Sequence, residues 1–175
     1  MKQLFVLTLV AVLAAGVLRA QSPAAAPTDP QIAMIAVTAD TVDIDAGKLA
    51  AEKSSNPKVK QFAQLMVSDH TSVNKKATAL AKKLKLTPEE SETSRSLKSD
   101  GDKNLEKLRG LSGAEFDKAY IDNEVTYHTS VIGALNTVLL PNAKNAELKA
   151  LLESGKPIFE SHLEHAKTLQ KSLNK

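Results

Sequence analysis

A long amphipathic helix predicted over residues 56–86 constrains the fold of this chain more than any other stretch. Asn56 is a suitable N-cap, and Pro57 takes the first helical position, where its missing N–H costs nothing. Apolar residues then recur at steps of three and four, which places them on one face: Val59, Phe62, Ala63, Met66, Val73, Ala77, Leu80 and Leu84. His70 falls within this stripe. Other helices must cover such a face, and the ring of His70 would then be buried among them.

The residues before this helix predict a second one that folds back against it. This helix begins near Asp29, which can cap it, with Pro30 in the first turn. It ends in the polar turn at residues 54–56. Because the connection is so short, we expect the two helices to form an antiparallel hairpin.

Residues 87–110 predict a helical crossover. Thr87 and Glu90 have the spacing of a capping box, and Gly110 closes the segment. Its apolar content is thin, and we expect a break at Gly101. The segment is long enough to carry the chain back along the first hairpin.

Two further helices make a second hairpin. Ser112 and Glu115 form another capping box, and the helix that they start should stop at Pro141. The last helix covers residues 143–173, and the sequence Gly-Lys-Pro at 155–157 should kink or interrupt it. Two hairpins joined by a long connection predict an all-α fold, namely the ferritin-like four-helix bundle. We expect it to form a single domain over residues 29–175.

The first twenty residues have the pattern of a signal peptide, with Lys2 followed by an apolar run and small residues up to Ala20. We expect cleavage near Ala20, a flexible lead at residues 21–28, and a periplasmic protein without a transmembrane span; an uncleaved signal anchor is the alternative. The chain contains no Cys, which excludes a lipoprotein anchor, disulfides and thiolate metal sites. Removing Lys2 and Arg19 leaves 21 basic and 20 acidic residues. This balance argues against nucleic acid as a partner.

Three segments of the chain resemble a bacterial envelope family known as domain of unknown function four-one-four-two. They are LAAEKSSNPKVKQFAQLMVSDHTSVN, LSGAEFDKAYIDNEVTYHTSVIGAL and LLESGKPIFESHLEHAKTL. The resemblance covers roughly residues 29–173. It implies a ferritin-like fold and an exported protein, periplasmic or associated with the outer membrane, and it brings no established reaction.

Five polar residues are predicted to lie near the middle of the bundle: Asp43, His70, Glu124, His128 and His162. Glu124 and His128 are four residues apart and share a face of their helix. Imidazoles and carboxylates that converge from facing helices are how helical bundles build transition-metal sites. Iron, manganese, zinc and copper are all chemically plausible here.

The sequence departs from the ligand pattern of ferritin-like di-iron proteins. Those proteins use Glu-x-x-His on two helices, whereas Val67, Val125 and Phe159 stand three residues before the three central histidines. The first helix offers Asp43 and Asp45 in place of Glu. These differences disfavour a carboxylate-bridged di-iron site, but they leave a His-rich mononuclear site open.

A purely structural network is the other explanation of these residues. A buried His often bonds to a carboxylate or a Tyr on another helix, and Asp69, Tyr120 and Tyr127 are available as partners. We favour a non-enzymatic envelope protein that acts in stress or binds another envelope protein, with this network as internal support. A metal-binding protein is the alternative. Acid–base catalysis has less support, and His165 is expected to face outward or to meet His162.

Overall fold

The computed structural model describes residues 26–174, and every regular element in this range is helical. This confirms the predicted all-α class. The predicted signal peptide (1–20) and most of the predicted lead (21–28) lie outside the described residues and stay predictions. Within residues 26–174, no helix is both long enough and apolar enough to cross a membrane.

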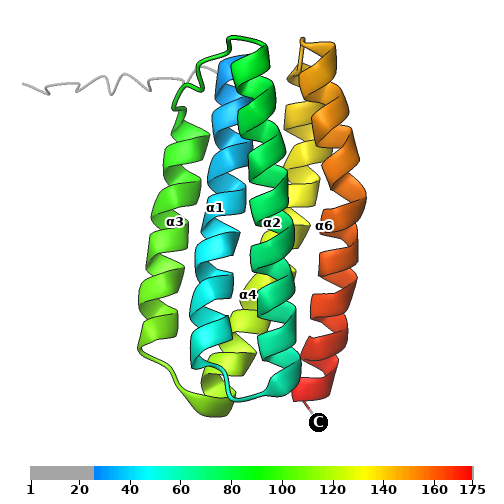
Figure 1. The fold of residues 1–175 in the computed structure, drawn as a ribbon. Coiled ribbons are helices and arrows are strands. Elements are labelled where there is room, and N and C mark those ends of the chain that lie inside the picture. Colours follow the sequence, from blue (N-terminus) through cyan, green and yellow to red (C-terminus); the bar gives the residue numbers. More distant parts are fainter. Residues whose placement is uncertain (1–25, 175) are drawn as a thin grey trace, which may run out of the picture.

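The first predicted hairpin is confirmed and consists of α1 (Asp29–Lys53) and α2 (Pro57–Lys83), which run antiparallel (Figure 1). The side-chain Oδ1 of Asn56 accepts the backbone N–H of Lys58 at 3.0 Å. Asn56 is therefore the N-cap of α2, as its position before Pro57 predicted.

The crossover helix, α3 (Glu92–Arg109), starts later than predicted. Its N-cap is Ser91, whose Oγ accepts the backbone N–H of Ser94 at 3.1 Å, while the Ser91 N–H donates to the Ser94 hydroxyl. The predicted capping box of Thr87 and Glu90 is wrong, because this reciprocal pair of bonds fixes the start of the helix instead.

Gly101 lies inside α3 and does not break it. It is buried against Val42 of α1, and a Cβ atom at this position would lie 2.7 Å from both Val42 methyl groups. The missing side chain lets the two helices approach closely. Their packing outweighs the poor helix propensity of glycine, which is why the predicted break is wrong.

The second hairpin contains four consecutive elements: α4 (Gly113–Ala134), the π-helical turn η1 (Leu135–Leu139), α5 (Leu140–Asn142) and α6 (Ala146–Leu173). Ser112 precedes α4 as predicted, but within the described residues its side chain accepts no capping hydrogen bond. Gly113 has a φ of 56°, in the left-handed region, so the first turn lacks the geometry that a capping box needs. The predicted box of Ser112 and Glu115 is wrong.

The predicted stop at Pro141 and the predicted interruption at residues 155–157 are wrong, while a kink at 155–157, the other possibility, stays a prediction. The chain remains helical past Pro141 to Asn142, with η1 directly before it, and α6 runs unbroken through Pro157. A proline removes one backbone donor and crowds the preceding turn, so the helix continues past it only where other contacts hold the chain. The packing of the buried Leu152 and His162, on either side of Pro157, holds α6 as one helix.

Asp29 does not cap α1, contrary to the prediction. The N-cap is Thr28, and its backbone N–H donates to the side chain of Gln31 at 3.1 Å. The carboxylate of Asp29 accepts the backbone N–H groups of Lys144 (2.8 Å) and Asn145 (2.9 Å) instead. It therefore ties the start of α1 to the start of α6.

The helices α1, α2, α4 and α6 form a four-helix bundle, and α3 lies on its outside against α1 (Figure 1). Because α3 carries the chain back along the bundle, α2 and α4 run in the same direction. This arrangement confirms the prediction of two antiparallel hairpins joined by a long helical crossover.

The bundle core has two apolar halves with a polar layer between them. The half near the α1–α2 turn includes Phe62, Met66, Leu108, Phe116 and Tyr120. The half at the other end includes Ile32, Ile35, Leu135, Leu139, Leu148 and Leu152. The layer between them contains the predicted site residues.

Candidate metal centre

All five predicted site residues meet in this layer. Asp43 comes from α1, His70 from α2, Glu124 and His128 from α4, and His162 from α6. Each is between 0% and 3% exposed. Four helices therefore bring imidazoles and carboxylates together in the interior, as their heights along the helices predicted.

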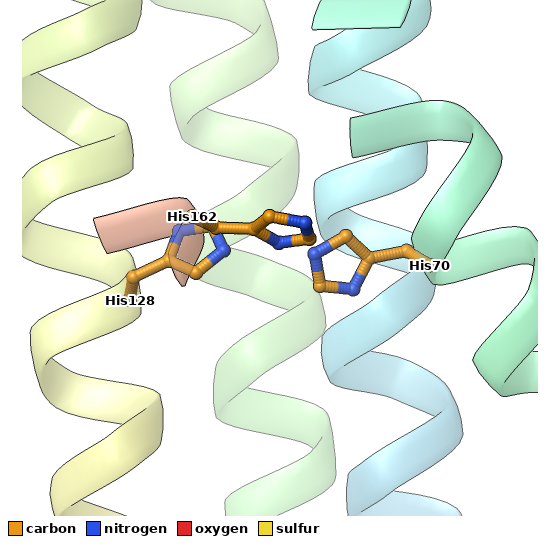
Figure 2. Close-up of side chains that lie close together, drawn as sticks. All are labelled: His70, His128 and His162. Carbon is orange, nitrogen blue, oxygen red and sulfur yellow. The ribbon is translucent and has the colours of Figure 1, made fainter. Parts of the chain in front are cut away.

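The three imidazole rings face one another (Figure 2). Their centroids are 5.6 Å apart for His70 and His128, 5.2 Å for His70 and His162, and 5.5 Å for His128 and His162. One nitrogen of each ring lies within 4.8 Å of the corresponding nitrogens of the other two. A single ion placed among them could contact all three rings.

The outer nitrogen of each ring bonds to an oxygen acceptor. His70 Nδ1 lies 2.7 Å from Asp40 Oδ1, and His128 Nδ1 lies 3.0 Å from the backbone oxygen of Glu124. His162 Nε2 lies 3.0 Å from Asp69 Oδ2. Carboxylates and carbonyls accept hydrogen bonds, so these partners place an N–H on each outer nitrogen.

The inner nitrogens are His70 Nε2, His128 Nε2 and His162 Nδ1, and all three are buried. None of them has a hydrogen-bond partner within residues 26–174. In a neutral ring whose outer nitrogen carries the proton, the inner nitrogen has a free lone pair. Metal-ligating histidines have this arrangement, with an outer N–H held by a carboxylate or a backbone carbonyl.

Two carboxylates lie beside the rings. Asp43 Oδ2 is 2.6 Å from His70 Nε2 and 3.4 Å from His128 Nε2, and Glu124 Oε2 is 3.5 Å from His128 Nδ1. The first contact joins two buried side chains, and neither carboxylate forms a hydrogen bond with any other described residue. Asp43, Glu124 and His128 also form a group whose ligand atoms lie within 4.8 Å of one another.

The charges at this centre are unevenly distributed. Burial disfavours a charged His70, but the carboxylates of Asp43 and Asp40 outweigh burial and raise the pKa of His70 to about 10. Burial likewise raises the pKa of Asp43, but His70, His128 and Glu124 together outweigh burial and the net shift is downward. Without a metal, His70 and Asp43 therefore form a buried ion pair.

The pKa values of the other ligand candidates are all shifted in the direction that favours the neutral form. Burial lowers the pKa of both His128 and His162, which keeps their inner lone pairs free. Burial, together with the negative charge of Asp43, raises the pKa of Glu124 well above its ordinary value. This shift favours a protonated Glu124 beside the carboxylate of Asp43.

Sequence reasoning missed Asp40, the outer partner of His70. It lies three residues before Asp43, and that spacing puts both on one face of α1; this was the available signal. Asp69, considered only as a general partner, holds His162. Asp45 lies at the surface beside Lys48 and takes no part in the centre.

His165 is exposed and lies outside the group of three histidines. Its ring contacts the edge of Phe62 at a centroid distance of 5.1 Å. Phe159, predicted only as a core residue, stacks on the ring of His70 at 5.3 Å with an interplanar angle of 9°. It forms one wall of the centre.

The fold and the centre define an all-helical bundle protein with a buried layer of histidines and carboxylates. The family described as "Domain of unknown function (DUF4142)" matches residues 16–169, and the chain belongs to this family. No curated protein matches the sequence at a significant level.

A solved structure, CopM in its Cu(II)-bound form, is similar in fold. The TM-score is 0.66, and the match covers 85% of this chain and 99% of CopM. The two sequences are 15% identical, so the similarity concerns the fold alone.

Proposed function

We propose that this protein binds one transition-metal ion in the bundle core, through His70, His128 and His162, with Asp43 as a fourth ligand and Glu124 beside it. The observation that carries the proposal is the pairing pattern of the three rings. Each outer nitrogen is held by an oxygen acceptor. The inner nitrogens of His128 and His162 are buried without a hydrogen-bond partner among the described residues, and that of His70 lies beside only the carboxylate of Asp43. Export to the periplasm, predicted from residues 1–20, is part of this proposal.

A metal accounts for polar atoms that a purely structural network leaves unsatisfied. A buried polar atom without a partner costs about 1–3 kcal/mol. The inner nitrogens of His128 and His162 incur this cost in the metal-free protein, and a bound ion would remove it by accepting both lone pairs. Buried polar groups without a partner are rare in native proteins, and a bound ion or water is a common explanation for them.

The donor set favours Cu(II) among the divalent ions. Imidazole suits copper, zinc, iron and nickel, and affinity for nitrogen and oxygen donors rises toward Cu(II) in the Irving–Williams order. The structure of CopM was determined in a Cu(II)-bound form, which supports trying copper first on a related fold. Zinc is the second ion to test, since it accepts the same ligands.

A structural role without metal is the second candidate function. Hydrogen bonds join α1 to α2 through Asp40 and His70, and α2 to α6 through Asp69 and His162. The Tyr127 hydroxyl also donates to the backbone oxygen of Ala39 at 2.8 Å, which joins α4 to α1. In that case the protein would be a non-enzymatic envelope protein that acts in stress or by binding a partner, with the layer fixing the helix register.

Thermal unfolding with and without Cu(II) separates the two functions. A ligand that binds only the folded state increases the free energy of unfolding, by about 2.7 kcal/mol at a ligand concentration of one hundred times its Kd. The melting temperature rises accordingly. The wild type and the control His165→Ala should show this shift, and His128→Ala should lose it. If neither Cu(II) nor Zn(II) stabilises the wild type, or if His128→Ala keeps the full shift, the metal-binding function is wrong.

A further inference from the structure

A cavity of about 280 Å³, partly open to solvent, lies among the long helices in the half of the bundle that contains Ile35, Leu135 and Leu152. Its lining is almost wholly apolar and comes from all the long helices. An apolar cavity that is left empty forfeits the contacts that its lining would otherwise make. Its size therefore points to an occupant.

The cavity exists because small residues occupy facing positions on four helices. Ala36 and Ala39 of α1, Ala77 of α2, Ala134 of α4 and Gly155 of α6 all line it. The opposite half of the core is filled by three fully buried aromatic rings. The void is thus confined to one half of the bundle.

The residues that line the cavity are spread along the helix axes. Its lining extends from Tyr127 to Leu139 on α4 and η1, and from Leu151 to Phe159 on α6. At about 1.5 Å per residue, these stretches correspond to roughly 18 Å and 12 Å. A cavity of about 150 Å³ holds benzene, so by proportion this one has room for roughly ten carbon atoms. An unbranched chain fits such a shape.

The polar groups of the lining determine which end of a chain enters. Thr93 and Ser130 are exposed and lie at the rim. Asp40 is buried at the inner end with its carboxylate bonded to His70, so it would repel a second carboxylate. The methyl end of a fatty acid can therefore enter, while its carboxylate stays at the rim in water.

We propose that this cavity binds a free medium-chain fatty acid of about ten carbons. A membrane phospholipid carries two acyl chains, and the cavity has room for one. This site is separate from the proposed metal ligands, because none of the three histidines lines it, although Asp40 and Phe159 of its lining also contact His70.

Calorimetric titration of the metal-free full chain with saturated fatty acids of six to fourteen carbons tests this proposal. The affinity should rise about fourfold per added methylene, since each buried methylene contributes about the same transfer free energy. The rise should stop near ten carbons, where the cavity is full. The ring signals of His70, which stacks on Phe159 at the inner end of the cavity, should shift in the NMR spectrum, while those of His165 should not.

Two matched variants of α2 locate the site. Ala77→Leu fills the cavity and should weaken decanoate binding at least tenfold while raising the melting temperature of the free protein. Ala79→Leu places the same side chain on the exposed face of α2 and should leave binding unchanged. Ala134→Leu fills the cavity from α4, so it repeats the test if Ala77→Leu does not fold.

Three results would overturn the proposal. The first is that no fatty acid in the series binds. The second is an affinity that keeps rising to fourteen carbons and is equal in the wild type and both cavity-filled variants, which means adsorption at the surface. The third is co-sedimentation of the protein with phosphatidylcholine vesicles in the absence of binding to free decanoate.

Discussion

In the metal-free protein, raising the pH from 6.5 to 10 should remove a large part of the stability, because His70 loses its proton over that range. Its pKa is raised from 6.5 in the unfolded chain to about 10 in the folded protein. The contribution of the charged ring is therefore fully present below pH 6.5 and is lost as the pH rises toward 10. Asp43, whose pKa is lowered, acts only in the acid range.

The shift in the pKa of His70 corresponds to at most roughly 5 kcal/mol of unfolding free energy. Urea unfolding of the metal-free protein at several pH values measures it, with His70→Asn as the reference variant. The stability difference between the wild type and this variant should be largest near pH 6.5 and should shrink steadily toward pH 10. His165→Asn, at an exposed position, should follow the wild type.

Metal affinity should change with pH in the opposite direction, because a ligand must release its proton to bind. Each proton displaced makes the apparent affinity rise tenfold per pH unit below the pKa of the group that loses it. For His70 that range extends up to about pH 10. A wild-type stability that runs parallel to His70→Asn over the whole range, or a Cu(II) affinity that stays flat, would refute the account of a charged His70 paired with Asp43.

Gly101→Ala should destabilise the protein by about 1–3 kcal/mol, because the added Cβ would collide with Val42 of α1. The control Gly133→Ala places its Cβ in open space and should stabilise the protein by up to about 1 kcal/mol. A Gly101→Ala protein as stable as the wild type in urea would contradict the close packing of α3 on α1. Asp69→Asn should weaken Cu(II) binding about 10- to 100-fold in calorimetry, because it no longer holds the outer nitrogen of His162 as firmly; unchanged affinity would mean that His162 is not a ligand. Asn56→Ala should cost about 1 kcal/mol through loss of the N-cap, and an unchanged melting temperature would argue against that role.

Periodicity in the sequence predicted the long helices well, whereas of the local N-capping signals only Asn56 is fully confirmed and the capping boxes predicted at Thr87 and Ser112 are wrong. Asn56 with Pro57 marks the start of α2, and the apolar periodicity of each long helix identifies its buried face. The same periodicity placed His70 and His128 inside the bundle, and counting residues from the α1–α2 turn put Asp43 and His70 at similar heights. These inferences need only helix geometry, which is why they succeeded.

Tertiary packing decided the features that the sequence did not reveal. Gly101 reads as a helix breaker until the Val42 side chain that packs against it is known. Pro157 reads as an interruption, yet its neighbours are held in the core. Asp40 could be recognised as a partner only after α1 and α2 were aligned, and the cavity depends on small residues of four helices meeting at one level.

Metal content of the untagged protein, purified from its own host and measured by mass spectrometry, tests the central claim most directly. We predict close to one equivalent of a transition metal per chain in the wild type and in His165→Ala. The double variant His70→Ala/His128→Ala should contain none. A wild-type protein that is free of metal, and that takes up neither added Cu(II) nor added Zn(II), would contradict the claim and leave the three histidines as a purely structural layer.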